Sequence, residues 1–207
     1  MTRTTLLRLG MFGAVIGLSA VCDGATITWC NIHPEGPAPI TYDGKPVPGK
    51  VTFGEPNLSN GALVQLWKAV SYIDDPRMQM PAYFWTDWKV DDVLLDQVNC
   101  GYGVFVHPEG TWSQTGTYPV VKGDTIYVRA YNLPMPEWNS APLWAREVTV
   151  RNHQGAIVSA TLTRDDIPLT FYFDNLQMDV PEPGSFLLIS SGLGVWALRR
   201  KSGGVRC

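Results

Sequence analysis

The segment Asp124–Leu133, with the sequence DTIYVRAYNL, decides the fold class because its side chains alternate between two faces. One face carries Ile126, Val128 and Ala130, and the other carries Tyr127, Arg129 and Tyr131. A period of two among β-branched and aromatic residues is typical of a β-strand. This segment therefore predicts a strand with one face toward a core.

Similar segments recur along the chain, separated by Gly, Pro and Asn. They predict strands at 26–29, 62–70, 103–106, 147–152, 156–163 and 169–173. The tripeptide His153-Gln154-Gly155 predicts a hairpin between two of these strands. Because no sustained helical period appears, we expect residues 25–179 to form an all-β body. An antiparallel β-sandwich of jelly-roll or immunoglobulin-like topology is the expected architecture.

The length and composition suit one globular domain. The 207 residues include 20 Gly and 16 Pro but only 17% charged residues, which argues against helical bundles. Residues 25–180 contain 17 acidic and 10 basic side chains. Such an acidic body lacks the basic surface that binds duplex nucleic acid, so we exclude nucleic acid as a partner.

Residues 1–24 read as a secretory signal peptide that forms a signal helix. Arg3 and Arg8 are followed by the apolar run Leu9–Val21, which is 13 residues long and short for a membrane span. The Sec translocon and signal peptidase are the partners that this segment predicts. Cleavage after Ala20, Cys22 or Gly24 remains open, as do lipidation of Cys22 and a retained amphipathic N-terminus.

The C-terminal residues 180–207 combine three parts. Pro181, Glu182 and Pro183 precede an apolar segment at 184–198, which predicts a transmembrane helix, and the basic tail 199–207 begins with Arg199, Arg200 and Lys201. The basic residues should stay cytoplasmic, so the body should lie outside the membrane. The apolar run is about 22 Å long as a helix, shorter than a 30 Å hydrocarbon core.

This arrangement resembles the PEP-CTERM sorting signal of exosortase substrates in Gram-negative bacteria that make exopolysaccharide. The resemblance implies an exported protein that rests transiently in the inner membrane. It also implies that an exosortase cuts near Pro181–Pro183 and leaves the product at the cell surface or outside the cell. The alternative is an ordinary tail anchor behind a proline-rich linker.

Two cysteines, Cys30 and Cys100, lie inside the body. Outside the cytoplasm we expect them to form a disulfide, and two buried reduced thiols are the alternative. The remaining cysteines, Cys22 and Cys207, would leave with the two terminal signals.

The tetrapeptide His-Pro-Glu-Gly occurs twice, at 33–36 and 107–110. The side chains of His33, Glu35, His107 and Glu109 would suit zinc or copper if the two copies met. We favour turns, because Pro and Gly stand where a type I turn prefers them. The aspartate pairs at 74–75, 91–92 and 165–166 leave calcium as a candidate cofactor, without a calcium-loop motif.

Aromatic residues gather in predicted loops, where Trp85, Trp88 and Trp112 could stack on sugar rings. Core packing is the other interpretation of these residues. The nucleophile, zinc-protease and phosphate-loop motifs are all absent from the sequence. We therefore expect a non-enzymatic surface or matrix protein that binds exopolysaccharide. The alternative is a secreted carbohydrate-active enzyme or a calcium- or sugar-binding module.

Overall fold

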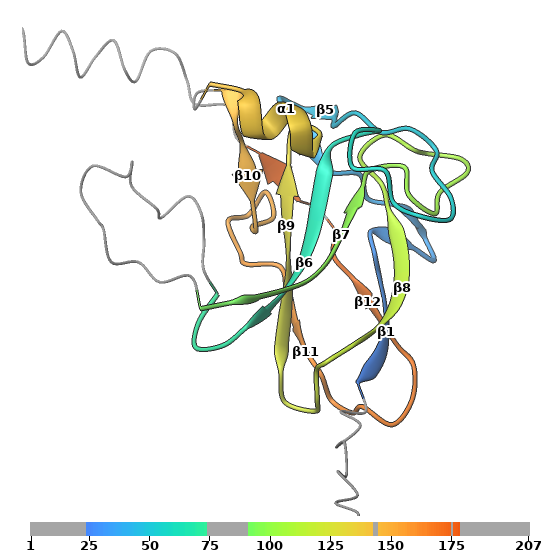
Figure 1. Ribbon diagram of the computed structural model, residues 1–207, viewed down its shortest axis with the longest axis vertical. Helices are drawn as coiled ribbons and strands as arrows, with labels where there is room; N and C mark the ends of the chain where they lie inside the picture. Colours follow the sequence, from blue (N-terminus) through green and yellow to red (C-terminus); the bar gives the residue numbers. More distant parts are fainter. Residues whose placement is uncertain (1–23, 74–90, 143–144, 175, 179–207) are drawn as a thin grey trace, which may run out of the picture.

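The computed structural model describes residues 24–73, 91–142, 145–174 and 176–178 (Figure 1). Within these ranges the chain is mostly β-strand, arranged in several sheets, so the all-β prediction is confirmed. The longer strands are β1 (Ala25–Cys30), β6 (Leu63–Ala69), β7 (Val93–Asn99), β8 (Ser113–Tyr118), β9 (Thr125–Tyr131) and β12 (Leu169–Tyr172). The shorter ones are β2 (Ile32–His33), β3 (Gly36–Pro37), β4 (Thr41–Tyr42), β5 (Lys45–Pro46), β10 (Val148–Thr149), β11 (Ser159–Thr161) and β13 (Gln177–Met178). One short helix is described, α1 (Met135–Ser140), which starts directly after Pro134.

Two larger sheets carry the body. One has the strand order β12-β1-β8, and the other has the order β10-β9-β6-β7 with β11 also paired to β9. A smaller sheet, β13-β4-β5, and the hairpin β2-β3 lie at the end of the body where β5 is labelled (Figure 1). The expectation of purely antiparallel pairing is wrong, because β1 pairs with β12 and β4 with β13 in parallel. The jelly-roll or immunoglobulin-like assignment stays a prediction.

Strand alternation explains which side chains enter the core. In β1 the side chains of Ala25, Ile27 and Trp29 are buried, while the intervening threonines face outward. The hydroxyl of Thr28 lies 2.8 Å from that of Thr115 on β8, a cross-strand pair that supports the register. In β9 the predicted inward face is also buried, and the opposite face is covered as well, as expected of a central strand.

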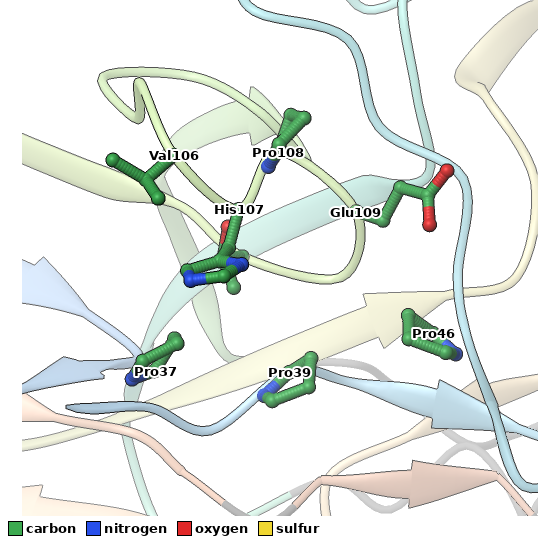
Figure 2. Close-up of a pocket in the computed structure, with 8 residues that line it drawn as sticks. Pro37, Pro39, Pro46, Val106, His107, Pro108 and Glu109 are labelled. Atoms are coloured by element: carbon green, nitrogen blue, oxygen red, sulfur yellow. The ribbon is translucent and has the colours of Figure 1, made fainter.

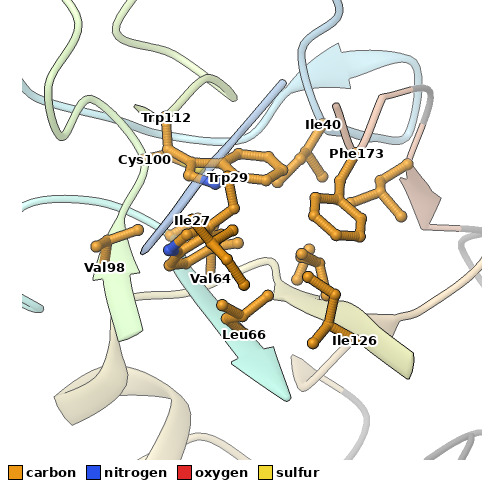
Figure 3. Close-up of a cluster of buried hydrophobic side chains, with 14 of the residues drawn as sticks. Ile27, Trp29, Ile40, Val64, Leu66, Val98, Cys100, Trp112, Ile126 and Phe173 are labelled. Atoms are coloured by element: carbon orange, nitrogen blue, oxygen red, sulfur yellow. The ribbon is translucent and has the colours of Figure 1, made fainter. Parts of the chain in front are cut away.

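The core lies between the two larger sheets (Figure 3). Trp29 contributes from β1, and Val64, Leu66 and Ile126 contribute from the other sheet. Loop residues complete the cluster, namely Ile40, Cys100, Trp112 and Phe173. Residues far apart in the sequence thus share one apolar interior.

The predicted hairpin at 153–155 forms only at its tip. Arg151 and Ile157 pair in an antiparallel bridge, and Gly155 adopts a positive φ of 80° in the turn between them. Outside this tip, β10 and β11 pair separately with β9 rather than with each other. β10 and β11 therefore form one edge of the sheet that contains β9, and a small loop interrupts this edge.

Sequence reasoning failed at three segments of the body, besides the short elements β2, β3, β4, β5, β13 and α1, which it did not predict. The segment 103–106 is not a strand, and its Phe105 is 80% exposed despite the apolar pattern. The strands β7 and β8 were not predicted. Each lies at the edge of its sheet and begins with partly exposed residues, so the apolar alternation that marks a strand is weak.

The expected terminal elements fall outside the described residues. These are the signal peptide up to residue 23, the transmembrane segment 184–198 and the basic tail 199–207. No helix within the described ranges has the length and apolarity to cross a bilayer.

Candidate functional site

A proline-lined groove of about 350 Å³ lies between the β3–β5 segment and the loop before β8, which we call the loop end of the body (Figure 2). One wall comes from the segment after β2, and the other comes from the loop that leads into β8. Its lining residues are Pro37, Pro39, Pro46, Val106, His107, Pro108, Glu109 and Thr111. A second cavity of about 250 Å³ shares Pro37, Val106 and His107 and continues toward Phe105. Prolines and other apolar side chains line most of both cavities, with the imidazole of His107 and the carboxylate of Glu109 at the groove.

The side chain of Asn31 holds the two walls of this groove together. Its Nδ2 donates to the carbonyl oxygens of Ala38 at 2.9 Å and Gly110 at 2.7 Å. Its Oδ1 accepts a hydrogen bond from the backbone N–H of Trp112 at 2.9 Å. Because Asn31 is fully buried, these bonds satisfy a side chain that would otherwise be costly to bury. The groove is therefore built into the fold, although nothing in the sequence pattern marked Asn31.

Both His-Pro-Glu-Gly copies form turns. In the first, His33 pairs with Gly36 across the tight hairpin β2-β3, and the His33 ring contacts the Tyr172 ring at a centroid distance of 4.4 Å. In the second, Glu109 and Gly110 form the turn, and Gly110 has a φ of 66°. Glu35 and Glu109 are both exposed. Within the described ranges, no three His, Cys, Asp or Glu side chains gather to hold a metal ion.

Of the three aspartate pairs, 74–75 lies outside the described residues, and Asp92 in the second pair occupies a structural position. Asp92 is buried and accepts hydrogen bonds from the backbone N–H of Val70 at 3.0 Å and from the Tyr127 hydroxyl at 2.7 Å. Arg129 adds a bond to the same hydroxyl, and its guanidinium lies 4.0 Å from the centroid of the Trp67 ring. Burial, with the bond to Asp92, raises the pKa of Tyr127. Sequence reasoning missed this network. The alternation that places Tyr127 and Arg129 on the same face of the strand was the signal that could have indicated it.

The sugar-stacking interpretation of Trp112 is wrong. Its ring is fully buried and packs against Trp29 with ring centroids 5.9 Å apart. A buried ring offers no face to a sugar, so Trp112 belongs to the core. The other two candidates, Trp85 and Trp88, lie outside the described residues.

The expected Cys30–Cys100 disulfide is not present, since both thiols are free and buried. Cys100 belongs to the core between the sheets, whereas Cys30 follows the inward-facing Trp29 on β1 and so points to the opposite face. The Cys30 Sγ instead lies 3.8 Å from the backbone oxygen of Ile32. Burial raises the pKa of both thiols, which keeps them protonated at neutral pH.

We expect both thiols to survive export in reduced form, because only an accessible thiolate reacts readily. Iodoacetamide should leave Cys30 and Cys100 unmodified in the native protein and alkylate both after unfolding in guanidinium chloride. Peptide mapping by mass spectrometry under non-reducing conditions measures this directly. A Cys30–Cys100 disulfide peptide from secreted protein would contradict it.

The C-terminal motif was compared with known families. A family model of the PEP-CTERM protein-sorting motif matches residues 179–201. The chain carries a PEP-CTERM sorting motif. The match includes Pro181, Glu182 and Pro183 and extends through Arg199 and Arg200 to Lys201, which confirms the resemblance drawn from the sequence. The PEP-CTERM motif begins directly after β13 ends at Met178, so it follows the body without a further described element.

The PEP-CTERM motif implies an exported protein that an exosortase processes and that reaches the surface or the exterior of the cell. The motif covers 23 residues and lies outside the described body. No curated protein and no solved structure matches the chain.

Proposed function

We propose that this chain is a non-enzymatic protein of the cell surface or extracellular matrix, delivered by exosortase processing of its PEP-CTERM motif. The match at residues 179–201, directly after the last described strand, is the observation that carries the proposal. Residues 1–24 direct the chain to the Sec translocon and are removed by signal peptidase. The basic residues 199–201 keep the C-terminus cytoplasmic, as the positive-inside rule requires, until the enzyme acts.

A structural role for the body is supported by how its polar side chains are used. Asp92 and Asp96 accept hydrogen bonds from the hydroxyls of Tyr127 and Tyr118. Asp124 forms an ion pair with Lys68, with 2.6 Å between Oδ2 and Nζ. These carboxylates hold strands together rather than facing each other across an open cleft, as glycoside hydrolysis requires.

We further propose exopolysaccharide as the ligand that retains the mature protein. The stretch 81–88, PAYFWTDW, is the densest group of aromatic residues in the chain, and aromatic rings stack on the apolar faces of sugars. Such a contact would hold an exported protein in a polysaccharide matrix without a covalent bond. Trp85 and Trp88 are the residues that we assign to this contact.

Mature protein should co-sediment with exopolysaccharide isolated from the producing strain. The double variant Trp85→Ala/Trp88→Ala should lose most of this binding, by about tenfold or more, because each stacking residue contributes on the order of 1 kcal/mol. Phe105→Ala, an exposed aromatic residue at the loop end, serves as the matched control and should bind normally. Equal sedimentation of the wild type and the double variant would refute the assignment. Release of reducing sugar ends during incubation would instead favour a carbohydrate-active enzyme.

A further inference from the structure

Two neighbouring loops present a cluster of exposed apolar side chains, which we call the apolar tip: Val51, Phe53, Phe105 and Val106. Their exposed fractions are 45%, 50%, 80% and 76%, respectively. The rings of Phe53 and Phe105 contact each other with centroids 4.5 Å apart. Exposed large apolar side chains that cluster in this way mark a surface that contacts an apolar partner.

The backbone beneath the apolar tip holds it away from the core. The N–H of Thr52 donates to the oxygen of Gly101 at 3.2 Å, and the N–H of Gly103 donates to the oxygen of Thr52 at 3.0 Å. Both glycines have positive φ, and a Cβ at Gly101 would lie 2.2 Å from the oxygen of Lys50. The two loops therefore pack backbone against backbone. Above this backbone contact, Phe53 stays half-exposed and Phe105 largely exposed.

The apolar tip lies at the end of the body from which the sorting motif leaves. Gln177 of β13 and Pro39 line one cavity, and Pro39 and Val106 line the proline groove beside it. Only five residues, 179–183, separate Met178 from the apolar segment that starts at residue 184. Fully extended, five residues reach about 18 Å. While the tail is in the membrane, this end of the body must stay within that distance of it.

We propose that the apolar tip docks on the outer leaflet of the membrane that the sorting tail crosses, and so orients the body for processing. This inference rests on the proposed function, since it requires the uncleaved tail. Tethering raises the local concentration of the bilayer, so a few apolar side chains suffice for docking. A second protein copy is a poorer occupant, because a stable protein interface uses about 20–30 residues on each side.

The charges near the apolar tip indicate that docking is hydrophobic rather than electrostatic. Lys50 adjoins Val51, and Glu55 lies close enough to Tyr102 to help raise the pKa of that hydroxyl. Opposite charges therefore flank the tip, and the described residues form no basic patch there for anionic lipid. Docking should persist at high salt, which screens charges but not apolar contacts.

Photo-crosslinking of the full-length chain in a host without exosortase tests the proposal. Benzoylphenylalanine in place of Phe105 should form adducts with phospholipid, detected as a lipid mass on the labelled peptide. The matched control carries the same label in place of Val121, which is 52% exposed. Its neighbour Val120 accepts a hydrogen bond from the N–H of Ala25, the first residue of β1, and β1 starts at the other end of the body (Figure 1). We expect at least about tenfold more lipid adduct at position 105, at low and high salt alike, from burial of a large apolar side chain.

Equal lipid yields at positions 105 and 121, or adducts at 105 with a second copy or another protein, would overturn the proposal. A second arm places the label at Phe53 and adds Phe105→Ser/Val106→Ser, which should lower the lipid yield about tenfold. Fractionation separates the two hypotheses. If the full-length chain is absent from the membrane, the proposed function fails; if it is present without lipid adducts, only docking fails.

Discussion

Replacing Pro181, Glu182 and Pro183 by alanine leaves the protein at full length in the inner membrane of a host that carries an exosortase. In the same host the wild-type protein should lose everything after about Glu182, including Arg199 and Arg200. The expected change is close to all-or-none, because the substitution removes the motif that the enzyme reads. Intact mass and membrane fractionation of both forms measure it.

The physical reason for this expected result is the order of the proline motif, the apolar segment and the basic residues in the tail. Prolines bar helix continuation and keep a peptide extended, so we expect the Pro181–Pro183 sequence to be accessible to an exosortase. A permanent membrane anchor does not require these prolines, and its apolar run is usually longer than about 22 Å because the hydrocarbon core is about 30 Å thick. Changing Thr163, Arg164 and Asp166 to alanine is a suitable control, since these residues are exposed, lie outside the strands and leave the motif intact. If the wild type retains Arg199 and Arg200, or the triple-alanine variant is trimmed equally well, the tail is an ordinary anchor.

Trp112→Ala should destabilise the body by about 3–5 kcal/mol, the usual cost of removing a large aromatic side chain from a core. The Trp112 side chain is fully buried and packs on Trp29. The backbone N–H of Trp112 donates a hydrogen bond to the Oδ1 of Asn31. A domain of this size is stabilised by about 5–15 kcal/mol, so the variant should lose roughly a fifth of its stability or more. The midpoint of thermal unfolding should fall by about 10 °C.

Trp112→Phe is the matched control for this prediction. The indole Nε1 of Trp112 has no hydrogen-bond partner among the described residues, so phenylalanine loses only apolar contact and should cost less than half as much. The same change at Trp29 should cost more than at Trp112, because the Trp29 Nε1 donates to the Tyr118 hydroxyl at 2.9 Å. Unchanged stability of Trp112→Ala, with weaker polysaccharide binding, would restore the sugar-stacking interpretation.

Prediction from the sequence succeeded where short-range pattern determines structure. The alternation in 124–133 corresponds to β9, and the segments 26–29, 62–70 and 169–173 correspond to β1, β6 and β12. It failed at 103–106, where an apolar pattern belongs to an exposed loop, and at β7 and β8 on the sheet edges. β7 buries only Val98 and Asn99, and β8 only Tyr118, so these strands carry little of the apolar alternation that marks a strand.

The candidate site was also predictable only where neighbouring residues determine the structure. The turn character of both His-Pro-Glu-Gly copies was visible in the sequence, because Pro and Gly restrict the local backbone. The buried clamp at Asn31 was not visible, since its partners Ala38 and Gly110 come from two different segments. The groove exists only where those segments meet.

The sequence by itself determined the export route and the β character of the body. A sorting motif is read as a linear order of prolines, apolar residues and basic residues, and strand alternation is a property of neighbouring residues, so neither needs a folded partner. Only the tertiary structure decided that Trp112 is core, that Cys30 and Cys100 face different ways, and that Phe105 stays in solvent. Burial depends on which distant segments pack together. The residue type alone does not show whether another sheet or water covers a given side chain.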